Sequence, residues 1–268
     1  MFFSSQGNVL RWDGSTWSVL PEPNSLYLSD LKVSNDTLWA HDKQSIYRFV
    51  NGKWELVFKA PGYDAVLDYV VDQDHMLWVA GYDVTKVWKQ QNSSILDIPV
   101  IEAKQTENVI KLEADQYGNI YMASRYRIYT WDGENWEAYK DFGKEIQSFA
   151  LIHNQPWVSV YSTETITDVY KLSHNEWKLI EGLNLDTGAN MPETVTGIYP
   201  SSNGKVVWLT TGPGHPGEGV IRYNIKTGET IRITEEEGLA DNVITDICED
   251  RRGTLWFTTW SGISSYGP

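Results

Sequence analysis

The 268-residue chain has one cysteine, no long hydrophobic run and few basic residues for its size. With Cys248 alone, no intrachain disulfide can form, and the alternating apolar pattern around it indicates an inert buried thiol. No run reaches 18 apolar residues, so no membrane-spanning helix is expected. The first residues, M-F-F-S-S-Q-G, lack the basic region and the apolar core of a signal peptide.

Positive charge is scarce, because 22 Lys and Arg stand against 36 Asp and Glu, for a net charge of −14. An acidic chain repels phosphate, so we expect neither a nucleic acid nor an anionic membrane as a partner, and no membrane insertion. In five of the repeats described below, the same strand position is occupied by Arg or Lys, which indicates a solvated strand face. These residues are Arg11, Arg48, Lys89, Lys171 and Arg222.

Catalytic motifs are also lacking. The five histidines form neither an H-x-x-x-H nor an H-E-x-x-H pattern. The segment G-P-G-H-P-G contains two prolines, which have no backbone N–H to offer a phosphate. Asp72, Asp74 and His75 crowd one turn, where turn chemistry explains the aspartates better than cation binding does. We therefore expect no cofactor, no metal and no catalytic residue.

What the chain does have is a sequence motif that recurs about every 40 residues. It runs from an aliphatic residue through an aromatic, a polar and a large residue to a turn and a Trp, as in V-L-R-W-D-G-S-T-W at Val9–Trp17. This period, in a chain rich in aromatics and Gly turns, is typical of a propeller or a solenoid. The large residue before the turn serves as a marker, and it is Trp12, Phe49, Gln90, Trp131, Leu172, Tyr223 and Tyr266.

A second aromatic column precedes these markers, and alternating segments that end in polar turns precede most of its members. Alternation with Gly turns indicates strands and hairpins, and Asp13-Gly14 and Asp132-Gly133 predict tight turns with positive φ at both residues. Each period therefore holds four strands. We predict an all-β fold, a β-propeller of four-stranded antiparallel blades, in one domain over residues 1–268. The column, expected to pack between blades, is Phe3, Trp39, Trp78, Tyr121, Trp157, Trp208 and Trp256.

The strand count bears on the number of blades. The pattern contains seven second and seven third strands, but six inner and six outer strands. Seven complete blades would need one outer and one inner strand before Met1, so seven blades imply a missing upstream segment and an incomplete N-terminal blade. Six blades are the alternative, with the C-terminal strands sharing a blade with the outer strand near Trp17. We favour seven.

Loop length suggests where a ligand binds. Connections from second to third strand, and from outer strand to the next inner strand, share one face of a propeller, and loops on a rigid scaffold often carry function. Three connections on that face are long, namely Tyr161–Asp168, Glu181–Thr194 and Thr211–Glu218. The alternative is that these are tolerated insertions without a function.

Six residues on the same face are candidate ligand contacts, and Arg125 and Trp260 stand out because they break the repeat. Aromatic rings stack on the apolar faces of sugars, and Arg pairs bidentately with a carboxylate, so the set suits a sugar or a uronic acid. The candidates are Tyr82, Arg125, Tyr126, Tyr161, His215 and Trp260.

The C-terminal repeat resembles a known family. The segment E-G-L-A-D-N-V-I-T-D-I-C-E-D-R-R-G-T-L-W-F-T-T-W-S-G-I-S-S-Y at Glu237–Tyr266 is similar to the two-component regulator propeller repeat, with Thr258 in place of the usual Gly. Asp115–Tyr121 keeps part of that pattern, and Gln90 departs from it. The resemblance implies an extracytoplasmic sensor propeller, periplasmic or secreted, of a family often found near glycan-uptake systems.

Two further readings stay open beside a non-enzymatic propeller that senses or captures a small-molecule or oligosaccharide ligand. One is a scaffold that binds a protein partner. The other is a lyase, because the streptogramin-inactivating propellers are similar in their L-W-F-T repeats. That chemistry needs a His base and metal-binding acids, and here His215 and Glu218 lie on one loop without an evident third partner.

Overall fold

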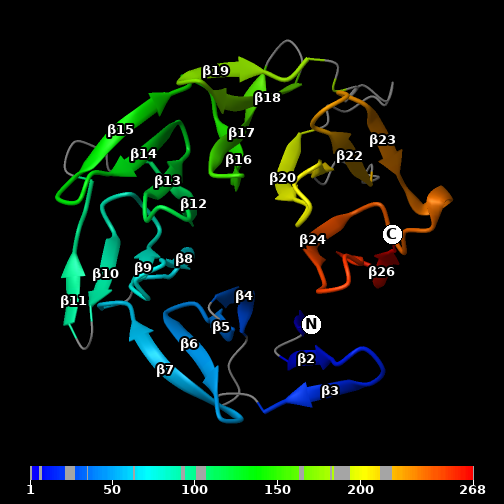
Figure 1. Ribbon diagram of the computed structural model, residues 1–268. Helices are drawn as coiled ribbons and strands as arrows, with labels where there is room; N and C mark the ends of the chain where they lie inside the picture. Colours follow the sequence, from blue (N-terminus) through cyan, green and yellow to red (C-terminus); the bar gives the residue numbers. More distant parts are fainter. Residues whose placement is uncertain are drawn as a thin grey trace. The chain divides into compact units, whose positions relative to one another are not determined.

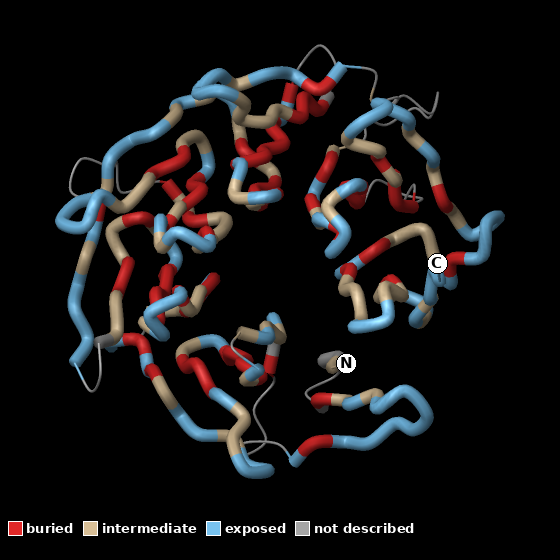
Figure 2. The backbone as a smooth tube through the Cα atoms, viewed as in Figure 1, coloured by how far each residue is buried: buried red, intermediate tan, exposed pale blue. Residues whose placement is uncertain are grey.

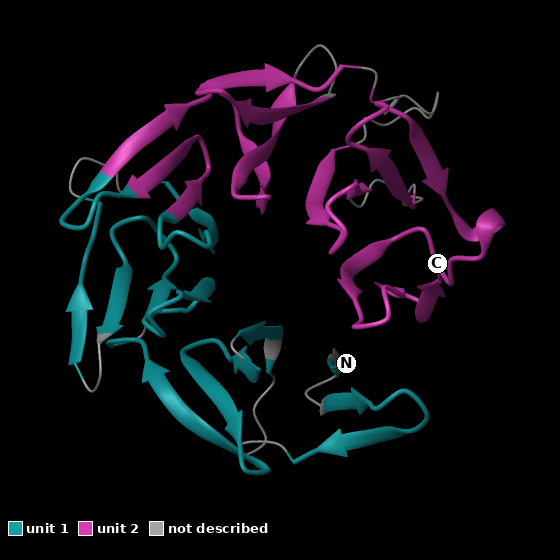
Figure 3. Ribbon diagram, viewed as in Figure 1, with its two compact units in different colours: residues 1–120, 131–136 teal, residues 121–130, 137–268 magenta. Residues whose placement is uncertain are grey.

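The structure is a computed structural model, and it describes residues 2–5, 8–21, 28–34, 36–62, 64–91, 94–100, 107–162, 166–181, 183, 194–211 and 219–267. The chain divides into two compact units, coloured separately in Figure 3. Unit 1 is residues 1–120 with 131–136, and unit 2 is residues 121–130 with 137–268. The expected single domain over residues 1–268 stays a prediction.

The described residues form 26 strands and one short 3-10 helix, Glu235–Glu237 (Figure 1). The first strands are β1 (Phe2–Ser5), β2 (Asn8–Trp12), β3 (Trp17–Leu20), β4 (Ser29–Ser34), β5 (Thr37–His41), β6 (Ser45–Val50), β7 (Lys53–Lys59), β8 (Asp68–Val71), β9 (Leu77–Ala80), β10 (Val87–Gln91), β11 (Ser94–Asp97) and β12 (Val109–Ala114). The others are β13 (Ile120–Ser124), β14 (Arg127–Trp131), β15 (Trp136–Asp141), β16 (Ile146–Ile152), β17 (Gln155–Ser162), β18 (Ile166–Ser173), β19 (Glu176–Leu179), β20 (Val195–Pro200), β21 (Val206–Thr211), β22 (Val220–Asn224), β23 (Thr230–Ile233), β24 (Ile244–Glu249), β25 (Leu255–Thr259) and β26 (Ile263–Tyr266).

These strands pair in chain order into seven sheets within the described residues. Five sheets have four strands, from β4–β7 to β20–β23, and two have three, β1–β3 and β24–β26. The predicted fold class, an all-β propeller of four-stranded antiparallel blades, is confirmed. The predicted number of seven blades stays a prediction, since two of the sheets have three strands. The division between the units passes through the β12–β15 sheet.

Turn residues explain where the strands reverse. Asn51 and Gly52 have φ of 51° and 79°, which gives a two-residue turn of the type that fits strand twist. His174 and Asn175 form a similar turn with φ of 52° and 61°. The prediction for Asp13-Gly14 and Asp132-Gly133 is partly wrong: both start hairpins, but Gly alone has positive φ there. The reason is a four-residue loop in which the Asp side chain accepts backbone N–H groups, as Asp13 does from Ser15 and Thr16 at 2.8 Å.

Most tryptophans of the aromatic column on the second strands are buried, as predicted. Trp39, Trp78, Trp157 and Trp208 are at most 8% exposed, and Trp256 is half-buried. On the third and outer strands the rings pair across the hairpin instead, with Trp12 and Trp17 at 5.1 Å between centroids. Figure 2 shows the contrast, with burial concentrated on second strands such as β9 and exposure along outer strands such as β11.

The core lies in layers between consecutive sheets of each unit, because no sheet can bury its own faces. In unit 1, Ile46 and Phe58 of the β4–β7 sheet pack with Tyr69 and Val79 of the β8–β11 sheet. In unit 2, Trp157 of the β16–β19 sheet joins Leu209 of the β20–β23 sheet. Among the described residues, no helix is long and apolar enough to cross a membrane.

Candidate functional site

The two kinds of connection predicted to share a face do meet. Where the β12–β15 sheet leads into β16, the Phe142 N–H donates to the Tyr126 carbonyl at 3.0 Å, and the Ile146 N–H donates to the Arg125 carbonyl at 2.7 Å. Residues 142–145 join an outer strand to the next inner strand, whereas Arg125 and Tyr126 form the turn from second to third strand. These hydrogen bonds place both connections on one surface of unit 2.

Arg125 is the first candidate contact on this surface, and it is already paired. Its guanidinium forms a charged hydrogen bond with the carboxylate of Glu145, and both side chains are about half exposed. Glu145 raises the pKa of Arg125, first through this hydrogen bond and then through its charge. The guanidinium also lies over the ring of Tyr126, 5.4 Å from its centroid. The structure therefore brings Arg125 and Tyr126 together and adds Glu145, which the sequence analysis missed.

The neighbouring residue Lys144 makes a second ion pair, with a residue that comes later in the chain. Its ammonium lies 2.8 Å from the carboxylate of Asp168 on β18, which is buried. The hydroxyl of Tyr170 donates to the same carboxylate at 3.4 Å. Burial, and then the charge of Asp168, raises the pKa of Tyr170. Residues 144 and 145 thus tie the β12–β15 sheet to the β16–β19 sheet within unit 2.

Tyr161 on β17 borders the connection at residues 142–145, and its placement corrects one prediction. The Tyr161 N–H donates to the Glu145 carbonyl at 2.7 Å, and its side chain is 41% exposed. The predicted long loop at Tyr161–Asp168 is largely strand, because β17 continues to Ser162, β18 begins at Ile166, and Tyr161 pairs with Thr167. Buried Thr167 anchors this extension, accepting a hydrogen bond from the Val195 N–H at 3.3 Å.

The other candidates belong to separate groups. Tyr82 is in unit 1, 61% exposed, in the turn between β9 and β10. Trp260 is in unit 2, 62% exposed, in the turn between β25 and β26. Its backbone N–H donates to the Val243 carbonyl at 3.3 Å. His215 and Glu218 lie outside the described residues, as do residues 212–217 and 184–193 of the long connections.

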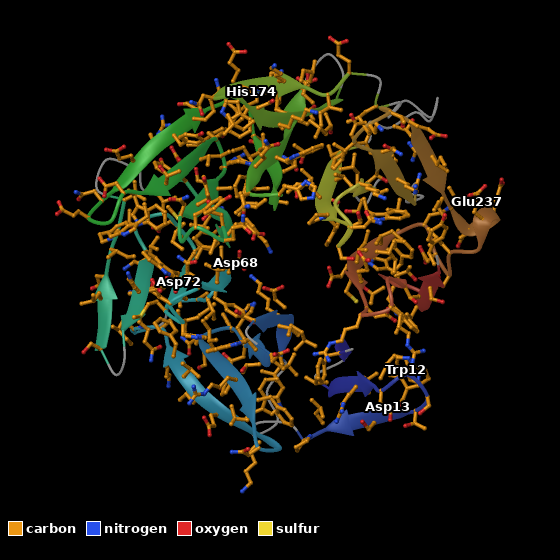
Figure 4. The ribbon with its side chains drawn as sticks, in the orientation of Figure 1. Trp12, Asp13, Asp68, Asp72, His174 and Glu237 are labelled. Atoms are coloured by element: carbon orange, nitrogen blue, oxygen red, sulfur yellow. The ribbon has the colours of Figure 1, made fainter. Side chains whose placement is uncertain are left out.

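A cluster of charges on the inner strands of unit 1 was also missed. Asp68 on β8, labelled in Figure 4, is buried and forms an ion pair with Lys32 of β4. Its second oxygen accepts the Leu112 N–H of β12 at 2.6 Å and lies 3.9 Å from the Lys111 ammonium. Burial raises the pKa of half-buried Glu113 on the same strand. A repeat alignment could have found this cluster, since Asp68 and Lys111 hold equivalent positions.

Tyr69 extends this cluster. Its hydroxyl donates to the Asp30 carbonyl at 3.0 Å, and the Lys32 ammonium lies 4.7 Å from its ring centroid. Burial raises the pKa of Tyr69 well above its usual range, and the charges of Asp30 and Asp68 add to the effect. The phenol therefore stays neutral and links β8 to β4.

Asp72 behaves as predicted from local chemistry, whereas Cys248, predicted to be buried, is only half-buried. Asp72, at the other end of β8 from Asp68, accepts the N–H groups of Asp74 and Met76 at 2.9 Å, so its carboxylate closes a turn (Figure 4). Cys248 is half-buried, and burial raises the pKa of its thiol to about 12. A thiol with such a pKa is almost entirely protonated near neutral pH and is a poor nucleophile.

Comparisons with known proteins agree with the repeat and the fold. A family model described as the two component regulator propeller matches residues 238–261. No curated protein sequence matches the chain. The extracellular domain of a hybrid two-component system from B. thetaiotaomicron is similar with a TM-score of 0.75 at 14% identity, over 100% of this chain and 36% of that one. A second such domain from the same organism gives 0.71 at 20% identity, over 99% and 38%.

A lyase also shares the fold. A catalytically inactive form of virginiamycin B lyase from Staphylococcus aureus, solved with quinupristin, gives a TM-score of 0.75 at 11% identity, over 98% of this chain and 92% of that one. The chain spans about a third of the length of the sensor domains, and at these identities each likeness shows the fold alone. The chain is a β-propeller that carries a two-component regulator propeller repeat at residues 238–261, within the segment Glu237–Tyr266 whose resemblance predicted it.

Proposed function

We propose that this chain is a non-enzymatic binding propeller that senses or captures a glycan outside the cytoplasm, in the periplasm or as a secreted protein. The observation that carries the proposal is the group of Arg125, Tyr126, Glu145 and Tyr161 on one surface of unit 2. In this group the charged Arg125–Glu145 pair adjoins the ring of Tyr126, and exposed Tyr161 bonds to Glu145 through its backbone. Sugar sites combine these two features, because C–H faces stack on rings while hydroxyls need polar partners.

The solved structures support the location and the role. The B. thetaiotaomicron domains are extracellular parts of hybrid two-component systems, and a sensor reads its ligand without converting it. Binding on turns and connections also suits a rigid sheet scaffold.

A scaffold for a protein partner is the second candidate. Tyr82 and Trp260 are 61% and 62% exposed, and exposed aromatic side chains often anchor protein interfaces. A scaffold would show no response to any small ligand, whereas a glycan sensor would gain thermal stability from its ligand.

The test is a thermal-shift and calorimetric screen of neutral and acidic oligosaccharides with the wild type, Arg125→Ala and Trp260→Ala. We expect at least one glycan to bind, and Arg125→Ala to weaken it by about tenfold or more through loss of a charged hydrogen bond. Mass spectrometry should recover the ligand unchanged; a converted ligand would favour the lyase reading. If no glycan binds, the protein scaffold is the better proposal. Equal affinities in all three proteins would exclude Arg125 as a ligand contact, and would exclude Trp260 as a second, separate contact.

A further inference from the structure

The pairing of Arg125 with Glu145 bears on which class of sugar the site accepts. A guanidinium that is free could hold the carboxylate of a uronic acid, which is one of the two ligand classes that suit the sequence. In the structure that position is filled, because the Glu145 carboxylate already accepts a hydrogen bond from Nη2 of Arg125. An incoming carboxylate would therefore have to displace Glu145 or sit beside it.

Displacement is unfavourable because of the charges nearby. Lys144, the adjacent cation, forms an ion pair with Asp168 at 2.8 Å, and Arg127 forms an ion pair with Asp141 at 2.8 Å. An acidic ligand on Arg125 would leave the Glu145 carboxylate without its cation. The carboxylates of the ligand and of Glu145 would then repel each other, which weakens binding of an acidic sugar. The net charge of −14 adds a general repulsion of anions.

A neutral sugar meets no such obstacle. An Arg–Glu pair offers N–H donors and carboxylate acceptors side by side, and each sugar hydroxyl can both accept and donate. Two neighbouring hydroxyls can then bind together, one accepting from Arg125 and the other donating to Glu145. Tyr126, whose ring centroid lies 5.4 Å from the Arg125 guanidinium, supplies an aromatic surface next to the pair.

We propose that this site selects neutral sugars through neighbouring hydroxyl groups held by the Arg125–Glu145 pair, and that it discriminates against uronic acids. The inference rests on the proposed function, since it names the ligand class of the same site. Glu145 is the residue that sets the specificity, because it removes the free positive charge that an acidic sugar needs.

The experiment compares a panel of acidic oligosaccharides with the same oligosaccharides after reduction of their carboxylates to alcohols, together with naturally neutral ones. Calorimetry is run on the wild type, Glu145→Gln and a matched control, Glu55→Gln. The control removes the carboxylate of an exposed Arg–Glu pair on β6 and β7, Arg48 and Glu55 at 2.9 Å. Glu145→Gln keeps the shape of the side chain and frees the charge of Arg125.

We expect the wild type to bind neutral or reduced sugars and to bind their acidic counterparts at least about tenfold more weakly. Glu145→Gln should lose about tenfold in affinity for the neutral sugar and gain affinity for the acidic one, while Glu55→Gln matches the wild type. Tighter wild-type binding of the acidic member of a pair, or an unchanged neutral affinity in Glu145→Gln, overturns the inference and leaves glycan binding standing. A panel without any binding overturns the proposed function and the inference with it.

Discussion

The indole N–H of Trp78 donates a hydrogen bond of 2.7 Å to the carboxylate of Asp72, six residues earlier in the chain. The same carboxylate closes the turn between β8 and β9, so one side chain fixes both the turn and the buried ring. Asp250 and Trp256 repeat this relationship at 3.2 Å in the β24–β26 sheet. Among the described residues, the buried indole nitrogens of Trp39 and Trp208 have no hydrogen-bond partner.

Replacing Asp72 by Ala should therefore destabilise unit 1. The change leaves the buried Trp78 N–H unpaired and opens the turn, and each charged hydrogen bond of this kind contributes about 1.5–3 kcal/mol. Urea unfolding followed by Trp fluorescence measures the loss. Asp74→Ala is the control, because Asp74 is exposed in the same turn and contributes its backbone N–H. Equal stability of the two variants would show that the Asp72 carboxylate contributes little.

The ion pair of Asp68 predicts a pH dependence of stability. Burial alone would raise the pKa of Asp68, but Lys32, Lys111 and the Leu112 N–H outweigh burial and hold the pKa below its ordinary value of 3.8. A carboxyl with a lower pKa in the folded state contributes stability above its unfolded pKa. That contribution is lost as the pH falls through 3.8 and toward the folded value.

Asp68→Asn should accordingly lower the free energy of unfolding near pH 7 by about 2–3 kcal/mol, somewhat less than for a fully buried pair because the Lys32 side chain is 24% exposed. The difference from the wild type should narrow below about pH 4, as Asp68 becomes protonated. Asp64→Asn, which removes a surface pair with Lys86, should change stability by less than about 1 kcal/mol at either pH. A difference for Asp68→Asn that stays constant with pH would contradict the ion pair.

Two glycines with similar backbones allow a matched comparison of space and strain. Gly219 and Gly228 have φ of 78° and 74°, so Ala is strained at both. A Cβ on Gly219 would lie 2.1 Å from the Ile233 carbonyl oxygen, whereas a Cβ on Gly228 would meet nothing within 4 Å. Gly228→Ala should cost about 1 kcal/mol, and Gly219→Ala roughly 1–3 kcal/mol more, because β23 must move. Thermal unfolding measures both, and equal costs would mean that the close approach at Gly219 is relieved without strain.

The sequence predicts the repeat well because its signals are local. Burial of Trp39, Trp78, Trp157 and Trp208 follows from one aromatic position per period, and the turn at Asp72 follows from the chemistry of Asp side chains. The prediction for the Asp13-Gly14 turn was wrong in turn type, because the side-chain hydrogen bonds of Asp13 favour a four-residue loop over a two-residue one.

The candidate site is harder to predict, because its contacts join separate connections. Arg125 meets Glu145, 20 residues away, only after a third and an outer strand have folded between them. The sequence predicts that Arg125 and Tyr161 share one face, but the pairing of the positive charge of Arg125 with Glu145 emerges only in the folded structure. Lys32 and Asp68 likewise lie on different sheets, so their pairing depends on how two repeats pack together.

Every strand pairing in the described sheets joins strands that follow each other in the chain. Each sheet can therefore close its hairpins over short stretches of chain, at a small cost in loop entropy. The apolar faces of a sheet are covered only when the adjoining sheet docks, so we expect stability to depend on nearest-neighbour interfaces, as in other repeat proteins. Folding should start in any well-packed pair of sheets and spread outward, and hydrogen exchange should protect second strands such as β9 and β17 longer than outer strands such as β11.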